Sequence, residues 1–426
     1  MTPADRYRSA AQILHDVAKP MRVLSRLAWP AAVREDFLAG GATKLPTVEY
    51  ATIDAAPIVE RIGAARQLLS AGSTIDDWLL RECDAIEATA LMLASIGTPE
   101  FHTHSAALYG EPSRPLRYDP TTPVDLARRI HRMIDELGEA NLLRPPVRDQ
   151  TAEDVAAFIR PAVAEHFGDQ APDVLVVDEL SANAVASTSR IKIRRDARFT
   201  RTDARQLLHH EAHIHVATGL NGRAQTDLPI LAIGHPGTTR TQEGLAVYAE
   251  YLSGTLELDR LRRLADRILA VEMVEDGADF IECYRWFLDR TGDPEQAFES
   301  TRRIFRGAVL TGGAPFTKDC AYLSGFLSVA TLVRAAFVAG RADTIGLLFA
   351  GKLDLFAIPA LAELRAMGLC RPAVFLPPWA QSPGWVLAHL TLTTFQQQVD
   401  LDRIAEAVRE VLAATPRVEI DLDRTA

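Results

Sequence analysis

Four of the eleven histidines in this chain fall within one short segment, 209–215, which reads HHEAHIH. Imidazole nitrogen is the commonest zinc ligand, and a carboxylate beside a ligand histidine can take a proton from metal-bound water. A fold that contains this segment must bring several of these side chains to one place. The segment therefore predicts a helix that carries a catalytic metal site, and the alternatives are a purely structural role of the histidines or a metal site without catalysis.

The spacing inside the segment leaves two ligand pairs open, because the familiar HExxH pattern is absent. His209 and His213 lie four residues apart, a rotation of about 400° on a regular helix, so they project from nearly one face. His210 and His215 lie five residues apart and miss each other by about 140° on such a helix. A local π-bulge, with about 4.4 residues per turn, would align this second pair. The second pair places Glu211 directly after the first ligand, whereas the first pair leaves Glu211 off the ligand face.

An open catalytic zinc site needs a third protein ligand, and the segment 242–246, which reads QEGLA, supplies a candidate. Glu243 sits in an apolar helix, where an unpaired buried carboxylate is costly and a metal would offset that cost. Gly244 would let the two ligand-bearing helices approach closely. The alternative is that Glu243 is a carboxylate at a helix N-terminus, stabilised by the helix dipole.

Composition excludes several other classes of protein. The 426 residues are 48% hydrophobic and 24% charged, which is typical of globular proteins. This length predicts two or three folding units, or one large enzyme domain with elaborations. The formal charge is −10 with no long basic block, so we expect no nucleic-acid partner. The N-terminus lacks an apolar signal segment, and the apolar run 320–333 is shorter than the roughly 18 residues that cross a bilayer, so we expect no membrane partner. The four cysteines form no CxxC pair and are expected as reduced core thiols of a cytoplasmic protein.

Helical periodicity dominates the chain. Amphipathic spacing predicts helices at 10–14, 58–69, 78–96 and 124–137, and a turn-rich stretch at 143–146 places a soft boundary near residue 150. Further helices are predicted at 151–168, 202–218, 241–255 and 401–413, with a proline-rich loop at 370–383. Two strands, 173–178 and 189–194, and a closing strand, 417–422, complete the pattern. We therefore predict a helical N-terminal region, 1–150, followed by a catalytic domain, 151–426.

The strand 189–194 alternates apolar and basic residues with a period of two. Ile191 and Ile193 are predicted to face the core, and Lys192 and Arg194 to face the other side. That basic face is either solvated or directed at an anionic partner. We hypothesise that this strand pairs with an extended acidic peptide.

The motifs resemble those of a known family. His210-Glu211 with His215, followed by the QEGLA segment, is similar to the QEGLA-motif family, the flavohaemoglobin expression-modulating proteins of bacteria, which are related to the microtubule-associated tyrosine carboxypeptidases. The resemblance extends from 108–110 through 189–194 to 306–307 and 316–319, and so covers most of the chain. It implies an α+β fold that is predominantly α-helical, with a small sheet and a zincin-like metallopeptidase core.

The resemblance also implies roles for the motif residues. His210, His215 and Glu243 would bind one zinc ion per chain, and Glu211 would be the general base. Zinc would polarise the scissile carbonyl and lower the pKa of its bound water, while Glu211 takes the water proton and delivers it to the leaving amine. The expected function is a zinc metallopeptidase of the carboxypeptidase type, which acts on the C-terminus of a peptide or protein.

Substrate contacts are predicted from the chemistry that such a reaction needs. A C-terminal carboxylate needs a cation, and Arg306 and Lys318, beside glycine-rich turns, are the candidates. An oxyanion donor could come from Tyr248, Tyr322 or His235. Each of these residues could instead be an ordinary core or ion-paired side chain.

Two other functions remain open. One is a metal-dependent hydrolase of a non-peptide amide, and the other is a regulatory or interaction protein that keeps a metal for folding. In the eukaryotic relatives a basic, disordered N-terminal extension helps to hold the microtubule. The sequence shows no such stretch, so we expect no microtubule binding.

Overall fold

The computed structural model describes residues 1–51, 53–116, 119–139, 147–178, 180, 182–397 and 399–415. Contacts within the chain divide it into two compact units, Met1–Ala380 and Gln381–Ala426. The boundary near residue 150 stays a prediction. The predicted turn at 143–146 and the predicted closing strand at 417–422 lie outside the described residues.

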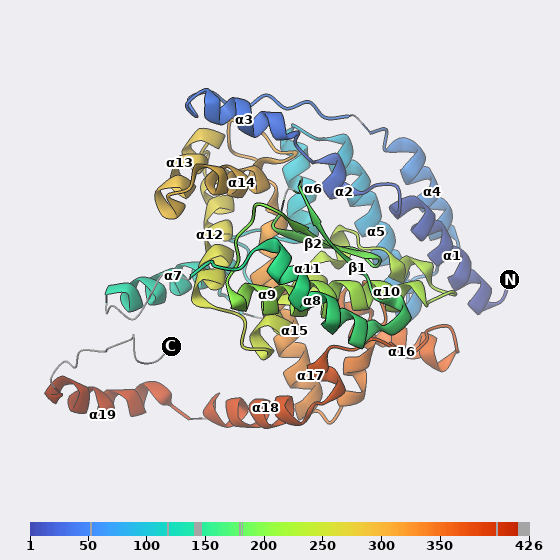
Figure 1. Cartoon of the computed structure of the whole chain (residues 1–426). Coiled ribbons are helices and arrows are strands. Elements are labelled where there is room, and N and C mark those ends of the chain that lie inside the picture. The colour runs from blue at the N-terminus through green and yellow to red at the C-terminus, as the bar shows by residue number, and fades with distance from the viewer. Residues whose placement is uncertain are drawn as a thin grey trace. The chain divides into compact units, whose positions relative to one another are not determined.

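Helices make up most of the first unit, as the sequence predicted (Figure 1). Before residue 150 they are α1 (Pro3–Ala18), α2 (Val23–Arg26), α3 (Ala31–Ala39), α4 (Ala56–Gln67), α5 (Thr74–Ala94), α6 (Pro99–Tyr109) and α7 (Pro123–Glu139). Next come α8 (Ala152–Phe167), α9 (Arg201–Leu207), the π-helix η2 (Leu208–Val216), α10 (Ala217–Arg223), α11 (Pro236–Leu252), α12 (Leu258–Glu275), α13 (Phe280–Thr291), α14 (Pro294–Phe305), α15 (Ala321–Val338), α16 (Ile358–Ala366) and α17 (Pro378–Gln381). Short 3-10 helices lie between them: η1 (Gly168–Gln170), η3 (Pro229–Ala232), η4 (Thr317–Cys320), η5 (Ala342–Phe349) and η6 (Leu355–Ala357). The predicted loop 370–383 is thus interrupted by α17.

Local capping signals explain where two important helices begin. Thr151 accepts a hydrogen bond of 3.1 Å from the backbone N–H of Asp154, and the Asp154 carboxylate accepts one of 2.9 Å from Thr151 N–H. This capping box starts α8 at the predicted place. Thr200 and Asp203 form the same reciprocal pair, with both bonds at 2.9 Å, at the start of α9. The second box therefore sets the origin of the helix that runs into the histidine segment.

A small sheet holds β1 (Asp173–Val177), β2 (Ala184–Ala186) and β3 (Arg190–Arg194) in the order β1-β3-β2. β1 is parallel and β2 antiparallel to β3. Both predicted strands in this region are confirmed, and Ile191 and Ile193 are fully buried as expected. The hypothesis that β3 pairs with a peptide is wrong, because β1 and β2 occupy both of its edges. The edge strands are β1 and β2, and the sequence did not predict β2.

Helix α8 packs on the sheet and ties it to the histidine segment (Figure 1). One core cluster contains Val155 and Ile159 of α8, Ile191 of β3 and Ala212 of η2, and all four are buried. Burial of these apolar side chains is the main favourable term in holding the layers together. The sheet edge and η2 are therefore placed against each other by a shared core.

Helices α11 and α15 pack along each other within the first unit. The buried side of α15 includes Leu323, Val329 and Val333, so the apolar run 320–333 lies in a helix that is partly core. Within the described chain, one helical stretch, Thr317–Val338, is long and apolar enough to cross a membrane by length and composition, a test that core helices also pass. The four cysteines are buried and unpaired, as predicted for core thiols.

The second unit contains α18 (Gly384–Gln397) and α19 (Leu401–Ala414), and α19 agrees with the predicted helix 401–413.

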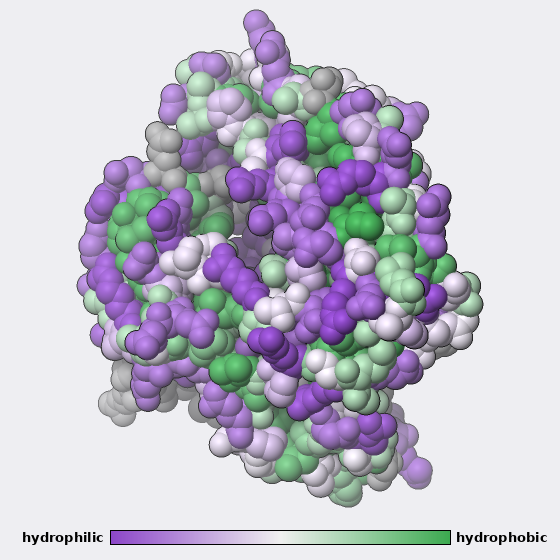
Figure 2. Space-filling model, turned by 90° about the vertical axis from the view of Figure 1, so that its right-hand side faces the viewer, coloured by the Kyte–Doolittle hydropathy of each residue, from purple (hydrophilic) through white to green (hydrophobic). Residues whose placement is uncertain are grey.

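On the face of the molecule seen in Figure 2, hydrophilic side chains predominate and hydrophobic ones form small, separate patches. This distribution is the usual result of placing apolar residues in a core.

Candidate active site

The histidine segment forms a π-helix. η2 continues α9 and runs on into α10. A π-helix has wider turns than an α-helix, so residues five apart face the same side. The π-type distortion that the pair His210 and His215 required is confirmed, and their ring centroids lie 4.9 Å apart.

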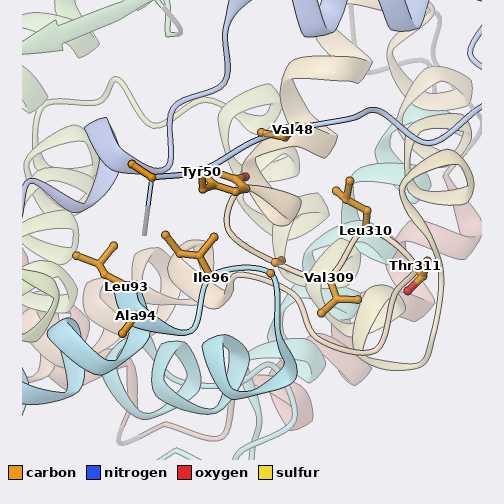
Figure 3. Close-up of a pocket in the computed structure, with 11 residues that line it drawn as sticks. Val48, Tyr50, Leu93, Ala94, Ile96, Val309, Leu310 and Thr311 are labelled. Atoms are coloured by element: carbon orange, nitrogen blue, oxygen red, sulfur yellow. The ribbon is translucent and has the colours of Figure 1, made fainter. Parts of the chain in front are cut away.

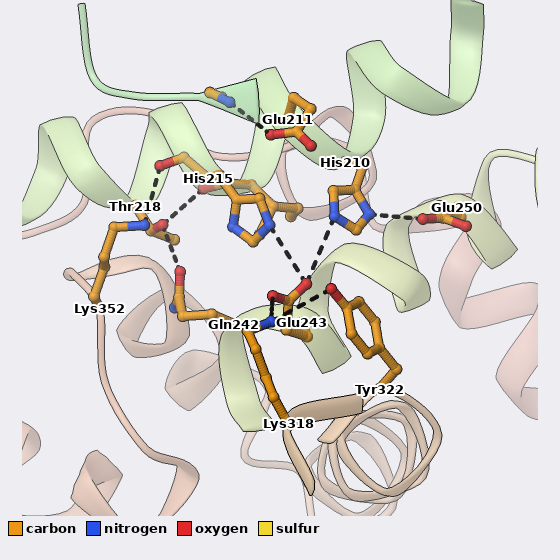
Figure 4. Close-up of polar contacts among 12 residues, drawn as sticks. His210, Glu211, His215, Thr218, Gln242, Glu243, Glu250, Lys318, Tyr322 and Lys352 are labelled. Carbon is orange, nitrogen blue, oxygen red and sulfur yellow. Dashed lines mark hydrogen bonds and ion pairs between the residues drawn. The ribbon is translucent and has the colours of Figure 1, made fainter. Parts of the chain in front are cut away.

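The two aligned histidines point from η2 towards Glu243 on α11 (Figure 4). The Nε2 atoms of His210 and His215 lie 3.7 Å and 3.8 Å from Glu243 Oε2. One donor atom from each residue lies within 4.8 Å of the other two, and no other such group of three donors occurs among the described residues. Two imidazoles and a carboxylate form the donor set of open catalytic zinc sites, so these residues fit a metal ion.

Glu250, on α11, orients the first of these ligands. Its Oε1 lies 2.6 Å from Nδ1 of His210, and it also accepts hydrogen bonds from Gln206 at 2.7 Å and from Arg260 at 3.1 Å. Burial acts to raise the pKa of Glu250, but Arg260 and His210 lower it to about 2. Because an ionised carboxylate only accepts hydrogen bonds, Nδ1 of His210 carries the proton and Nε2 is left as the metal donor.

Glu243 lies well inside α11 and not at its start. The helix begins at Pro236, behind the N-cap residue His235, because proline suits the first helical position. The explanation of Glu243 by the helix dipole is therefore wrong. Lys318 Nζ lies 2.8 Å from Glu243 Oε1. Burial acts to raise the pKa of Glu243, but Lys318 and the two ligand histidines hold it well below its usual range.

The residues on either side of Glu243 set the position of α11. Gln242 Oε1 accepts a hydrogen bond of 2.8 Å from Thr218 Oγ1, which joins α11 to α10. A Cβ atom on Gly244 would lie 2.3 Å from the carbonyl carbon of Gly325 in α15. Gly244 thus brings α11 against α15, and the expectation that it serves the approach of the two ligand-bearing helices is wrong.

Replacing Gly244 by alanine is expected to destabilise the protein by about 1–3 kcal/mol, because backbone must move to admit the added methyl group. The shift also displaces Glu243, so metal affinity is expected to fall. Gly63→Ala is the matched control, because a Cβ at this helical glycine of α4 meets nothing within 4 Å. Urea unfolding and metal titration of both variants check this, and equal stability of the two would contradict it.

Glu211 lines a cavity beside the metal group. Its Oε2 accepts a hydrogen bond of 3.1 Å from the backbone N–H of Ala186 on the edge strand β2 (Figure 4). Burial raises the pKa of Glu211. A carboxylate with these properties, next to a metal group and open to a cavity, is suited to act as a general base.

The alternative ligand pair, His209 and His213, is not part of the metal group and lies beside His166 of α8. The Nδ1 atoms of His209 and His213 are 3.3 Å apart, and the His213 ring lies 4.7 Å from the ring of His166 on α8. Burial lowers the pKa of His213 to about 3. Within the described chain, no three donor atoms that include this pair all lie within 4.8 Å of one another.

The predicted substrate residues fall into two groups. Tyr322 lines the cavity, and its hydroxyl lies 3.5 Å from Nζ of Lys318. Arg194 also lines it, with Nε 2.6 Å from Asp196 Oδ1, whereas Lys192 does not. Lys318 itself is engaged by Glu243. Tyr322 is therefore the predicted oxyanion donor that the structure brings to the cavity.

His235, Tyr248 and Arg306 are buried and do not line this cavity. His235 Nε2 lies 2.7 Å from a carboxylate oxygen of Glu82 on α5. Tyr248 packs edge-on against Trp379, with ring centroids 5.4 Å apart. The Arg306 guanidinium lies 5.5 Å from the centre of the Phe316 ring. The structure gives these three residues core contacts instead of the substrate contacts that the sequence suggested.

Arginines dominate the wall of the cavity, which has a volume of about 530 Å³. Among the described lining residues are Arg34, Arg148, Arg194, Arg198, Arg260, Arg263, Arg267 and Arg303. The sequence analysis did not identify Glu250 or the arginines of α12 as site residues, although their spacing along a helix could have indicated them. Glu250 follows Glu243 by seven residues, and Arg260, Arg263 and Arg267 share one face of α12.

A second cavity, of about 390 Å³, is lined by apolar residues such as Val48, Leu93, Ile96 and Leu310 (Figure 3). Tyr50 provides the one ionisable side chain among its described lining residues. This cavity offers no acid, base or metal donor set for catalysis.

Comparison with protein families finds a match over most of the chain. The family model described as microtubule-associated tyrosine carboxypeptidase matches residues 35–398. The matched region includes the sheet, η2, α11 and α12, and therefore the whole candidate site. A comparison with curated proteins found no match.

Proposed function

Because the chain belongs to the microtubule-associated tyrosine carboxypeptidase family, we propose that it is a zinc-dependent carboxypeptidase that removes the last residue of a peptide or protein. One observation carries the proposal. His210, His215 and Glu243 converge on one point, and the Glu211 carboxylate stands beside them at the cavity wall. The QEGLA segment, 242–246, supports a place among the QEGLA-motif proteins.

The proposed mechanism assigns one task to each group at the site. Bound zinc would supply polarisation of the scissile carbonyl and a water molecule of lowered pKa. Glu211 accepts the proton of the attacking water and delivers it to the leaving amine. The bond from Ala186 N–H keeps the Glu211 carboxylate at the cavity wall. Tyr322 donates its hydroxyl hydrogen to the developing oxyanion.

The edge of β2 offers a place for the substrate backbone. In its pairing with β3, Ser187 N–H donates to Arg190 O at 2.7 Å and Arg194 N–H donates to Asn183 O at 2.9 Å. The alternation of an antiparallel pair then turns the N–H and C=O of Ala184 away from β3. Asn183 and Ala184 line the cavity. An extended peptide can add to this edge and reach Glu211.

The choice of substrate follows from the family. Tyrosine is the first C-terminal residue to test, because the family name contains it. The same name implies microtubules as a partner, and cosedimentation with microtubules tests this against our expectation of no binding. Hydrolysis of small amides without any release from peptides would favour the non-peptide alternative. A cytoplasmic site of action stays our prediction.

Metal analysis of the purified protein tests the ligand set. We expect about one zinc per chain in the wild type and none in His215→Ala or Glu243→Ala, because two remaining protein ligands hold zinc poorly. His209→Ala and His213→Ala are matched controls from the same helix and are expected to keep the metal. Zinc that persists in His215→Ala but is lost in His213→Ala would overturn the assignment. Failure to release a C-terminal residue from any peptide of a complete library would overturn the proposed activity.

A further inference from the structure

Arg267 is a cation in the wall of the cavity that forms no direct ion pair among the described residues. Six of the eight arginines there pair with carboxylates, in the pairs Arg34–Glu295, Arg148–Asp259, Arg194–Asp196, Arg260–Glu250, Arg263–Asp259 and Arg303–Asp319. In the part of the chain that the structure describes, the guanidinium groups of Arg198 and Arg267 make no hydrogen bond or ion pair. Arg198 is exposed to water, whereas Arg267 is partly buried. Arg267 is thus the partly buried arginine of the wall that has no direct ion pair within the described chain.

The electrostatic environment distinguishes Arg267 from its paired neighbour. Burial, together with the charge of Arg303, lowers the pKa of Arg267 to about 9. Burial also acts on Arg303, but the Asp319 carboxylate reverses the effect and raises the pKa of Arg303. A buried charge without a partner is costly, and an anion bound from outside would remove that cost.

Arg267 lies beside Tyr322, which in turn lies beside Lys318, the cation that pairs with the metal ligand Glu243. Its Cζ is 5.8 Å from the centre of the Tyr322 ring. The Tyr322 hydroxyl is 3.5 Å from Lys318 Nζ, which is 2.8 Å from Glu243. Lys318 pairs with Glu243 and Arg303 pairs with Asp319, whereas Arg267 senses the charge of Asp319 but forms no direct ion pair among the described residues. The single charge of Arg267 is the complement of one carboxylate.

We propose that Arg267 binds the C-terminal carboxylate of the substrate and thereby makes the enzyme an exopeptidase. This rests on the proposed carboxypeptidase function. The planar guanidinium matches a carboxylate with two parallel hydrogen bonds. The terminal carboxylate lies one residue beyond the scissile bond, about 3.5 Å of extended chain, so its anchor must belong to the cavity that holds the reacting groups, and Arg267 and Glu211 line the same cavity. Arg267 takes the role that the sequence suggested for Arg306 and Lys318.

Two labelled hexapeptides test the assignment. Both end in tyrosine, one with a free carboxylate and the other with a C-terminal amide. Wild type is expected to prefer the free carboxylate by about 10- to 100-fold in kcat/KM, the worth of a charge-assisted hydrogen bond. In Arg267→Gln the preference for the free carboxylate is expected to shrink to about threefold or less, because the neutral glutamine side chain at position 267 has no charge to attract a carboxylate. Arg198→Gln is the matched control and is expected to keep the wild-type preference.

Binding and stability measurements separate this role from a structural one. In the inactive Glu211→Gln background, calorimetric titration should show that adding Arg267→Gln weakens binding of the free-carboxylate peptide and leaves that of the amide unchanged. Arg267→Gln is also expected to unfold close to the wild-type temperature, since Asp319 keeps its ion pair with Arg303. Arg267→Lys keeps the charge and should retain part of the preference.

The outcomes separate failure of the inference from failure of the proposed function. If wild type releases tyrosine and Arg267→Gln keeps the full preference for the free carboxylate, Arg267 is not the anchor. An equal loss on both peptides, in activity and in binding, would likewise overturn the inference and show a structural role. If wild type releases nothing from either peptide, the carboxypeptidase function itself fails.

Discussion

Replacing Glu211 by glutamine is expected to lower kcat by about 10²- to 10⁴-fold while the metal stays bound, because a general base contributes this much and an amide cannot accept a proton. The glutamine oxygen can still accept the hydrogen bond that Ala186 N–H donates, so the local structure should persist. Burial raises the pKa of Glu211, which means that the fold disfavours its ionised form. The variant should therefore be at least as stable as wild type.

Three measurements on the Glu211→Gln variant decide its meaning: peptide hydrolysis, zinc content and thermal unfolding. Glu165→Gln, an exposed site on α8, is the control and should match wild type in all three. Full activity in Glu211→Gln would remove Glu211 from the mechanism. Loss of zinc together with activity would show that Glu211 supports the metal group and would leave the base unassigned.

Replacing Glu250 by alanine is expected to cost about 3–5 kcal/mol of stability, because the variant leaves the buried guanidinium of Arg260 without its carboxylate. It also removes the acceptor that holds Nδ1 of His210. Loss of such a support weakens metal binding by about 10- to 100-fold. Urea unfolding and zinc competition titration measure the two effects separately.

A double substitution separates the two roles of Glu250. Glu250→Leu with Arg260→Met should recover most of the lost stability, because no charge is left unpaired, but it should not restore zinc affinity. Glu257→Ala, at an exposed position, is the control and should change stability by less than about 0.5 kcal/mol. Wild-type zinc affinity in Glu250→Ala would mean that His210 needs no support from Glu250.

The parts of this protein that the sequence predicted correctly depend on neighbours close in the chain. Thr151 and Asp154 mark the start of α8, because a capping box spans only three residues. Ile191 and Ile193 alternate with basic residues, which predicts a strand with one buried face. The spacing of His210 and His215 predicted the π-type distortion, because no regular α-helix turns both imidazoles to one side.

The errors concern partners that lie far apart in the chain. Gly244 packs on Gly325 and not towards the histidines, and the sheet edge beside Glu211 belongs to β2 and not to β3. His235 pairs with Glu82 of α5, away from the cavity. None of these contacts follows from periodicity, because each depends on how separate helices and strands cross.

The sequence by itself determined the chemistry that this protein can carry: the donor types, their spacing on one helix, and a glutamate beside the first ligand. Only the tertiary structure decided how that chemistry is arranged. It placed Glu250 behind His210, put Lys318 on Glu243, and left Arg267 at the cavity wall with no direct ion pair among the described residues. The physical reason is that helix period and capping act over a few residues, whereas ion pairing and burial act between any groups that the fold brings together.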